Sequence, residues 1–190
     1  LDRVPADQIS ASEFYKNEEH AKAALMAVYS NMKYDDVFGL QFAMDGLGGI
    51  AMGYDPPSYQ VFQRGRYDVK ESKVLAKWRY LYEGIARANN VLQNIDKCDM
   101  ADELKVQYKG EVKFLRALYY FTLMDFFGGV PIYDESVVVA DSYSEMKAPR
   151  NSIDEVRNFV LKDLAEAANV LPESWPKTDY GRATKYAAIP

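Results

Sequence analysis

Residues 102–131, DELKVQYKGEVKFLRALYYFTLMDFFGGVP, decide the fold of this chain of 190 residues. Apolar side chains recur through them at steps of three and four residues, the spacing of one face of an α-helix. Asp102 is suited to cap the start of this helix. Gly128-Gly129 followed by Pro131 ends it, because glycine permits a left-handed conformation beyond a helix and proline blocks continuation. The stretch therefore predicts a helix from Asp102 to about Phe127, with one buried face formed by Leu104, Tyr108, Val112, Leu115, Leu118, Tyr119 and Leu123.

Other stretches of the chain have the same helical spacing. A helix is predicted from about residue 17 to 34, after a capping-box pattern at residues 10–13, and another from about 72 to 95. A further capping box at residues 152–155 begins a helix that Pro172 ends. Thr184 resembles the cap of a fifth helix, and because the sequence stops at Pro190 we expect the chain to be truncated. The expected fold class is all-α, with helix pairs and at least one long loop.

Part of this pattern matches the tetratricopeptide repeat, a helix-turn-helix unit, although no clean period of about 34 residues is present. The matching residues are Trp78, Leu81 and Ile85, and in a second copy in register Leu104, Tyr108, Ala117 and Phe121. We therefore expect Phe121 to be buried, so that its truncation destabilises the fold.

The counts of histidine and cysteine exclude several classes of enzyme. One His and one Cys leave no multi-histidine metal centre, no cysteine-based zinc cluster and no internal disulfide. His20 is the single candidate base, and no nucleophile accompanies it, so we interpret it as an exposed helix residue. Cys98, between acidic residues, is interpreted as a small apolar residue. We predict a protein without catalytic activity, metal or cofactor.

Charge and hydropathy limit the partners of the chain. The net charge of −5 argues against nucleic acid, because binding phosphates requires a basic face. The longest unbroken apolar run, residues 23–29, is far shorter than the roughly 18 residues that a membrane span needs. No signal peptide is present, so we expect the chain either to be cytoplasmic or to have been processed already.

The segment from Asp45 to Asp68 differs from the helical stretches. Glycines and prolines interrupt it so often that we expect a long loop, and long loops in compact domains are commonly functional. Aromatic side chains on a loop have no helical face to pack on, so a larger share of them is available for binding. This loop carries Tyr54, Tyr59, Phe62 and Tyr67, with Arg64 and Arg66 between them.

Several motifs, taken in order and spacing, carry a resemblance to one family. Residues 111–121 (EVKFLRALYYF) and residues 126–132 (FFGGVPI) are similar to its hallmark helix and to the turn that follows. Further similar segments are residues 1–5 (LDRVP), 78–90 with ARANN at its end, 149–152 (PRNS) and 181–185 (GRATK). Together they resemble the SusD/RagB family of nutrient-binding lipoproteins of the Bacteroidetes outer membrane.

The resemblance implies a non-catalytic protein built on tetratricopeptide-like helix pairs with long loops, the SusD-like α-helical fold. It implies a lipoprotein exposed on the outer membrane, held there only through a lipid on a residue upstream of this chain, which captures glycans and delivers them to a SusC-like TonB-dependent transporter. Because members are much longer, residues 1–190 are expected to be the N-terminal part of a SusD-like domain whose C-terminal part lies outside this sequence. Arg116 and Arg150 are expected to pair with carboxylates inside the fold or to hold helix ends.

The resemblance also implies a ligand site in the loop, since starch-binding members contribute part of an aromatic arc from the matching region. The loop here lacks tryptophan, which argues against starch. A flat aromatic ring covers the apolar face of a sugar, and polar neighbours bond its hydroxyl groups. The predicted ligand-binding residues are Asp45, Tyr54, Tyr59, Phe62, Arg64, Arg66 and Tyr67.

Two other functions stay open at this point. The helix pairs could form an interaction scaffold that caps a transporter, or the site could bind a nutrient other than glycan, such as peptides. An enzyme is disfavoured, because no nucleophile, base or metal set is evident.

Overall fold

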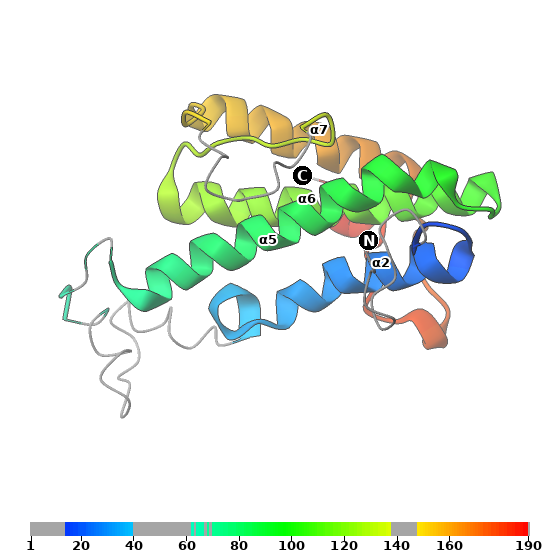
Figure 1. Ribbon diagram of the computed structural model, residues 1–190, viewed down its shortest axis with the longest axis horizontal. Helices are drawn as coiled ribbons and strands as arrows, with labels where there is room; N and C mark the ends of the chain where they lie inside the picture. Colours follow the sequence, from blue (N-terminus) through cyan, green and yellow to red (C-terminus); the bar gives the residue numbers. More distant parts are fainter. Residues whose placement is uncertain are drawn as a thin grey trace, which may run out of the picture.

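Four long helices dominate the computed structural model, which describes residues 14–39, 62, 64–66, 68, 70–137 and 148–189. They are α2 (Glu18–Ser30), α5 (Ser72–Asn94), α6 (Asp102–Phe127) and α7 (Ile153–Val170). Figure 1 shows that consecutive helices run in alternating directions, so that α2 and α5 form one antiparallel pair and α6 and α7 another. The described residues contain no strand, and their one isolated bridge pairs Asn17 with Asp99. The prediction of an all-α fold is confirmed.

Short helical turns complete the described part of the chain. They are η1 (Asn31–Lys33), the π-helical η2 (Asp35–Gly39), η3 (Ile95–Lys97), η5 (Lys177–Asp179) and η6 (Tyr186–Ala188). The N-cap of η6 is Lys185, without a side-chain bond, so the prediction for Thr184 was wrong by one position, although the Thr184 hydroxyl accepts a hydrogen bond from the N–H of Ala187 at 3.3 Å. The helix that it precedes is a single 3-10 turn within the described residues.

The helix ends follow the local signals in most cases. Ser152 and Glu155 form the predicted capping box at the start of α7, each side chain bonding the backbone of the other. Gly128 ends α6 with a φ of 71°, a conformation that favours glycine. The prediction for Asp102 was wrong: Ala101 occupies the N-cap position without a side-chain bond, and Asp102 lies in the first turn. A carboxylate there still favours the helix through its dipole. The capping-box pattern at residues 10–13 lies outside the described residues.

Helix α6 lies at the centre of the core and packs against α5, α7 and α2. The hydroxyl of Tyr119 on α6 donates to the carbonyl of Val28 on α2 at 2.7 Å, so a buried phenol joins two helices that are distant in sequence. Gly84 on α5 permits this approach, because a Cβ there would lie 2.6 Å from the Tyr119 ring and 2.7 Å from the Asn31 amide. The core is therefore organised around α6 rather than around separate helix pairs.

Phe121 corrects one expectation about α6. It was expected to be buried, yet 51% of its surface is exposed, while the adjacent Tyr120 is fully buried. Successive helical residues are rotated by roughly 100°, so a residue next to a core position can face outward. The match to the tetratricopeptide pattern assigned Phe121 by spacing between repeats rather than by the face of its own helix.

We expect Phe121→Ala to lower the free energy of unfolding by less than about 1 kcal/mol, since little buried surface is lost. Leu123→Ala, at a fully buried position of the same helix, should cost roughly 2–5 kcal/mol. Urea unfolding followed by circular dichroism measures both. Equal losses for the two variants would contradict the exposed position of Phe121.

Two arginines hold the scaffold together, as expected. Arg116 on α6 is 2% exposed, and its guanidinium donates from Nε and Nη2 to the two carboxylate oxygens of Asp163 on α7 at 2.7 and 2.9 Å. Its Nη1 donates to Asn89 Oδ1 at 2.7 Å and to Glu135 at 2.5 Å. Arg150 donates to the carbonyls of Phe127 and Gly129 at 3.0 and 2.8 Å, which satisfies the end of α6.

His20 and Cys98 have structural surroundings. The ring of His20 stacks on Phe14 with centroids 5.3 Å apart, and its backbone N–H binds the side chain of Asn17 at the start of α2. Cys98 is buried, and burial raises the pKa of its thiol, which disfavours the reactive thiolate.

A second polar cluster fixes the C-terminal segment to the helices. Glu111 on α6 is fully buried and accepts two hydrogen bonds from Arg182, at 2.6 and 3.0 Å, and one from the Tyr29 hydroxyl at 2.6 Å. The Arg182 guanidinium lies 3.9 Å from the centroid of the Trp175 ring. The segment after α7 is thus held by a buried carboxylate rather than by apolar contacts alone.

Candidate functional site

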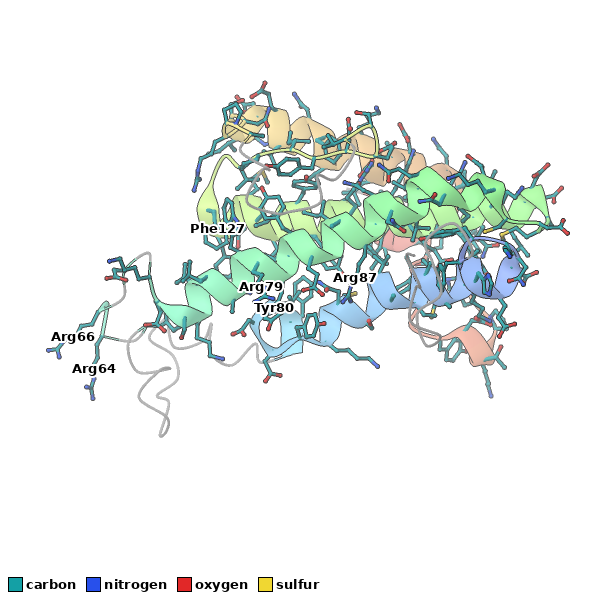
Figure 2. The ribbon with its side chains drawn as sticks, viewed as in Figure 1. Arg64, Arg66, Arg79, Tyr80, Arg87 and Phe127 are labelled. Atoms are coloured by element: carbon teal, nitrogen blue, oxygen red, sulfur yellow. The ribbon has the colours of Figure 1, made fainter. Side chains whose placement is uncertain are left out.

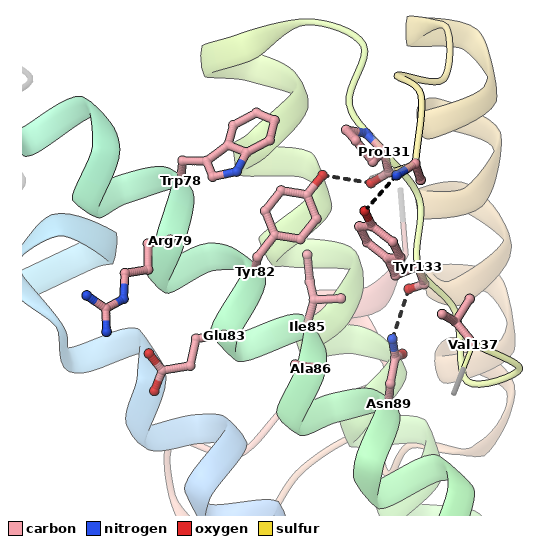
Figure 3. A pocket seen from close by; sticks show the side chains of 11 residues that line it. Trp78, Arg79, Tyr82, Glu83, Ile85, Ala86, Asn89, Pro131, Tyr133 and Val137 are labelled. Carbon is pink, nitrogen blue, oxygen red and sulfur yellow. Dashed lines mark hydrogen bonds between the residues drawn. The ribbon is translucent and has the colours of Figure 1, made fainter. Parts of the chain in front are cut away.

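A pocket of about 950 Å³ lies along α5, facing the extended segment that follows α6. Figure 3 shows α5 on one side, with Trp78, Tyr82 and Asn89 along it, and Pro131 and Tyr133 opposite. We call this pocket the α5 groove. Its lining residues are Trp78, Arg79, Tyr82, Glu83, Ile85, Ala86, Asn89, Pro131, Tyr133, Val137 and Ala148.

The wall on α5 follows from the spacing of its residues. Trp78, Tyr82, Ile85 and Asn89 are separated by four, three and four positions, which brings them onto one face of the helix. The same spacing predicted an apolar face on α5. Part of this face packs on the core, and the part that carries Trp78 and Tyr82 is only partly buried.

The opposite wall is fixed by hydrogen bonds from side chains of the helices. The Tyr82 hydroxyl donates to the carbonyl of Pro131 at 2.7 Å, and the Asn89 amide donates to the carbonyl of Tyr133 at 2.9 Å. The hydroxyl of Tyr120 donates to the same carbonyl at 3.0 Å and accepts the N–H of Tyr133 at 2.7 Å. Because these backbone groups are bound at both ends of the segment, the width of the α5 groove is set by the fold.

The side-chain amide of Asn89 is oriented by Arg116, which also pairs with Asp163 and Glu135. Arg116 donates to its Oδ1, which leaves the Nδ2 group to bind the carbonyl of Tyr133. Burial raises the pKa of the Tyr82 phenol above its usual value, with smaller contributions from Tyr120 and Tyr133, so Tyr82 acts here as a neutral hydrogen-bond donor. The polar groups of the floor are thus largely engaged with one another.

Aromatic rings gather at the other end of the α5 groove. The Trp78 ring lies 5.0 Å from Tyr82 and 5.1 Å from Phe127, the latter edge to face, and Arg150 lies 5.4 Å from its centroid. No hydrogen-bond acceptor for the indole N–H of Trp78 is present among the residues that the structure describes. A ring-shaped ligand here would meet an apolar surface beside a free donor.

Arg79 and Glu83 stand on the rim of the α5 groove, on the side away from Pro131 (Figure 3). Glu83 pairs with Arg87 at 2.5 Å, so its charge is compensated. Arg79 lies over the Tyr80 ring at 5.8 Å and forms no ion pair within the described ranges. The rim therefore presents one uncompensated guanidinium.

Of the seven residues predicted to bind ligand, the structure describes Phe62, Arg64 and Arg66. Asp45, Tyr54, Tyr59 and Tyr67 fall outside the described residues. Phe62 is buried, with 7% of its surface exposed, and Arg64 and Arg66 are exposed. Figure 2 shows both arginines beyond the N-terminal end of α5, well apart from Arg87. None of these three described residues lines the α5 groove.

Sequence reasoning missed the α5 groove. The sequence predicted only the helix that carries Trp78 and Asn89. The signal that could have marked them was the width of its apolar face, which extends beyond what one partner helix covers. In the described part of the chain we find no group of three or more His, Cys, Asp or Glu side chains that could hold a metal ion. Of the helices described, none has the length and apolar character required to cross a bilayer.

Comparison with known proteins identifies relatives over nearly the whole chain. The chain is 29% identical to SusD-like protein P25 of Formosa agariphila, over 99% of its own length and 37% of the relative. A SusD-like protein of Bacteroides fragilis has a similar structure, with a TM-score of 0.78 and 26% identity over 98% of this chain and 36% of that one. A solved laminarin-binding SusD-like protein gives a TM-score of 0.79 and 29% identity, over 92% of this chain and 38% of that one.

The chain therefore spans little more than a third of the length of these relatives. The family model described as "Starch-binding associating with outer membrane" matches residues 7–190. Proteins of this family bind carbohydrate and are not catalytic. Since the match extends over almost all of the sequence, the chain belongs to the SusD-like family of starch-binding proteins that associate with the outer membrane.

Proposed function

We propose that this chain is the N-terminal part of a cell-surface lipoprotein that binds glycan and passes it to a SusC-like TonB-dependent transporter. The observation that carries the proposal is the family match over residues 7–190. The laminarin-binding relative, 29% identical, supports a glycan as the ligand. Nothing in the proposal requires a reaction: the protein holds the glycan and releases it unchanged.

Within this function, the segment from Asp45 to Asp68 is proposed to contact the glycan. The aromatic side chains of Tyr54, Tyr59 and Tyr67 would cover sugar faces, while Asp45, Arg64 and Arg66 bond hydroxyl groups. The exposure of Arg64 and Arg66 supports this role. Phe62, being buried, has little ring surface to offer and is proposed to pack the loop.

Affinity electrophoresis of the chain in gels that contain single polysaccharides tests the proposal. We expect at least one neutral or acidic polysaccharide, laminarin among those tried, to slow its migration. Replacing Tyr54, Tyr59 and Tyr67 together with Ala should weaken that binding at least roughly tenfold, since each aromatic contact contributes about 0.5–1.5 kcal/mol.

The matched control replaces Tyr180 and Tyr186, two exposed tyrosines of the C-terminal segment, with Ala. This variant should bind as the wild type does. A chain that migrates unchanged in every polysaccharide would contradict glycan binding, and an unchanged affinity of the triple variant would place the site outside the loop. Delivery to a transporter is tested by co-purification of the lipoprotein with a TonB-dependent transporter from solubilised outer membranes.

A further inference from the structure

We propose that the α5 groove is a second sugar-binding site, and that the sugar it takes carries a negatively charged group, a carboxylate or a sulfate ester. The inference rests on the proposed glycan-binding function, and it adds a site whose lining includes none of the described residues of the predicted loop site. Three features support it: an aromatic end, an indole N–H for which the described residues offer no acceptor, and a rim guanidinium that has no ion-pair partner among them.

The aromatic end of the α5 groove suits the apolar face of a pyranose ring. Trp78 and Tyr82 are partly buried, so that their rings are fixed by the core while part of each stays accessible. Phe127 packs against the edge of Trp78 and holds its orientation. A ring held this way loses little conformational freedom when a ligand binds, which favours affinity.

The indole N–H of Trp78, which has no acceptor among the residues that the structure describes, favours a polar ligand beside this ring. A hydroxyl or ring oxygen of a sugar accepts such a donor, whereas an apolar side chain would leave it unpaired at a cost of about 1–3 kcal/mol. The floor contributes few open polar groups, because Tyr82, Asn89 and Tyr133 are already bonded to one another or to backbone. Hydrogen bonding at the Trp78 end therefore selects a ligand that has oxygen atoms at its rim.

The charges near Trp78 favour an acidic substituent. Within the described ranges Arg79 has no carboxylate partner, and the hydrogen bonds of Arg150 there go to the carbonyl groups of Phe127 and Gly129. The charge of Glu83 is matched by Arg87. At the opposite end Asp134, whose pKa is lowered chiefly by its hydrogen bond with Ser136, adds negative charge next to Tyr133. The acidic group is thus directed toward the rim at Arg79, away from Asp134.

The net charge of −5 does not oppose this assignment. Charges in solvent are screened over roughly 8 Å at physiological ionic strength, so the potential inside the α5 groove depends on the nearest side chains. A guanidinium also matches the geometry of a carboxylate or sulfate, to which it donates two parallel hydrogen bonds.

Fluorescence can follow this site alone, because the sequence contains two tryptophans, Trp78 and Trp175. In a Trp175→Phe background, the emission of Trp78 is titrated with a galacturonic acid hexamer, a sulfated carrageenan oligosaccharide and the neutral oligosaccharide maltohexaose. We expect at least one acidic probe to change the emission and to bind about ten times more tightly than the neutral one. Circular dichroism confirms that the background variant is folded.

Arg79→Gln, at an exposed position that leaves the core intact, should remove the preference for the acidic probe. Trp78→Phe, which keeps an aromatic ring but loses the indole N–H, should weaken binding about threefold to tenfold by calorimetry. Arg157→Gln, which replaces an exposed arginine of α7 that pairs with Asp154, is the matched control and should leave affinity unchanged.

Two results overturn the inference while leaving the proposed function intact. One is glycan binding with no change in Trp78 emission, and the other is binding at Trp78 that neither prefers the acidic probes nor responds to Arg79→Gln. Failure of every polysaccharide to bind the wild-type chain contradicts the proposed function itself, and with it the second site.

Discussion

Replacing Arg116 with Met is expected to lower the free energy of unfolding by about 3–5 kcal/mol. Arg116 and Asp163 are each only 2% exposed, and their two hydrogen bonds join α6 to α7. Without the guanidinium, Asp163 is left as a buried charge, and Asn89 loses the donor that fixes its amide. Urea unfolding monitored by circular dichroism measures the loss.

A double-mutant cycle separates the ion pair from simple loss of packing. Asp163→Leu in the Arg116→Met background removes the stranded carboxylate, so the double variant should be more stable than Arg116→Met alone. Arg157→Met, at an exposed position on α7, is the control and should change stability by less than about 1 kcal/mol. Additive losses across the cycle would mean that the pair is not coupled as the structure indicates.

The second large effect is expected at Glu111, where Leu should cost roughly 2–3 kcal/mol. This change removes the acceptor of the Tyr29 hydroxyl and of two Arg182 hydrogen bonds, while Arg182 keeps its contact with Asp179 at 2.7 Å. The loss should be partly local, because the segment after α7 is released from the helices.

Two measurements detect that release. The emission of Trp175, which lies on the Arg182 guanidinium, should shift to longer wavelength as its ring becomes solvated, and trypsin should cleave faster between Lys177 and Lys185. Glu166→Gln, which alters an ion pair with Lys113 near the protein surface, is the control and should do neither. Unchanged protease resistance in Glu111→Leu would show that other contacts suffice to hold the segment.

The helices were predictable because their signals are local. The capping box at Ser152 and the Gly-Gly-x-Pro stop after Phe127 placed the corresponding ends of α7 and α6 correctly. Asp102 was misplaced by one position, since a carboxylate suits both the N-cap and the first turn of a helix. The resemblance to a known family supplied the fold, and the expectation that Arg116 and Arg150 support it was confirmed.

What could not be predicted depends on contacts between distant segments. That Asp163 is the partner of Arg116 is a consequence of how α6 and α7 pack, 47 positions apart in sequence. The α5 groove likewise exists because residues 131–137 return to α5, where Tyr82 and Asn89 bind their carbonyls. Periodicity distinguishes a buried face from an exposed one, yet it does not show which part of a wide apolar face stays open.

The predicted loop site remains a prediction. The loop was predicted to bind ligand because its sequence contains aromatic residues and arginines. Composition alone does not establish where those side chains lie. Phe62 illustrates its limit: the loop prediction was wrong at this residue, whose backbone is helical and whose side chain is buried, with 7% of its surface exposed. Binding measurements on the tyrosine variants will decide the role of the remaining residues.

The central position of α6 has a consequence for how the molecule loses its structure. In a linear array of repeats each unit touches only its neighbours, and units can melt one at a time. Here α2, α5 and α7 all pack on α6. Detaching any one of them therefore exposes apolar surface of the core that the other helices share. We therefore expect this region to unfold in a single cooperative transition, and helical hairpins cut from it to lack a shared interior.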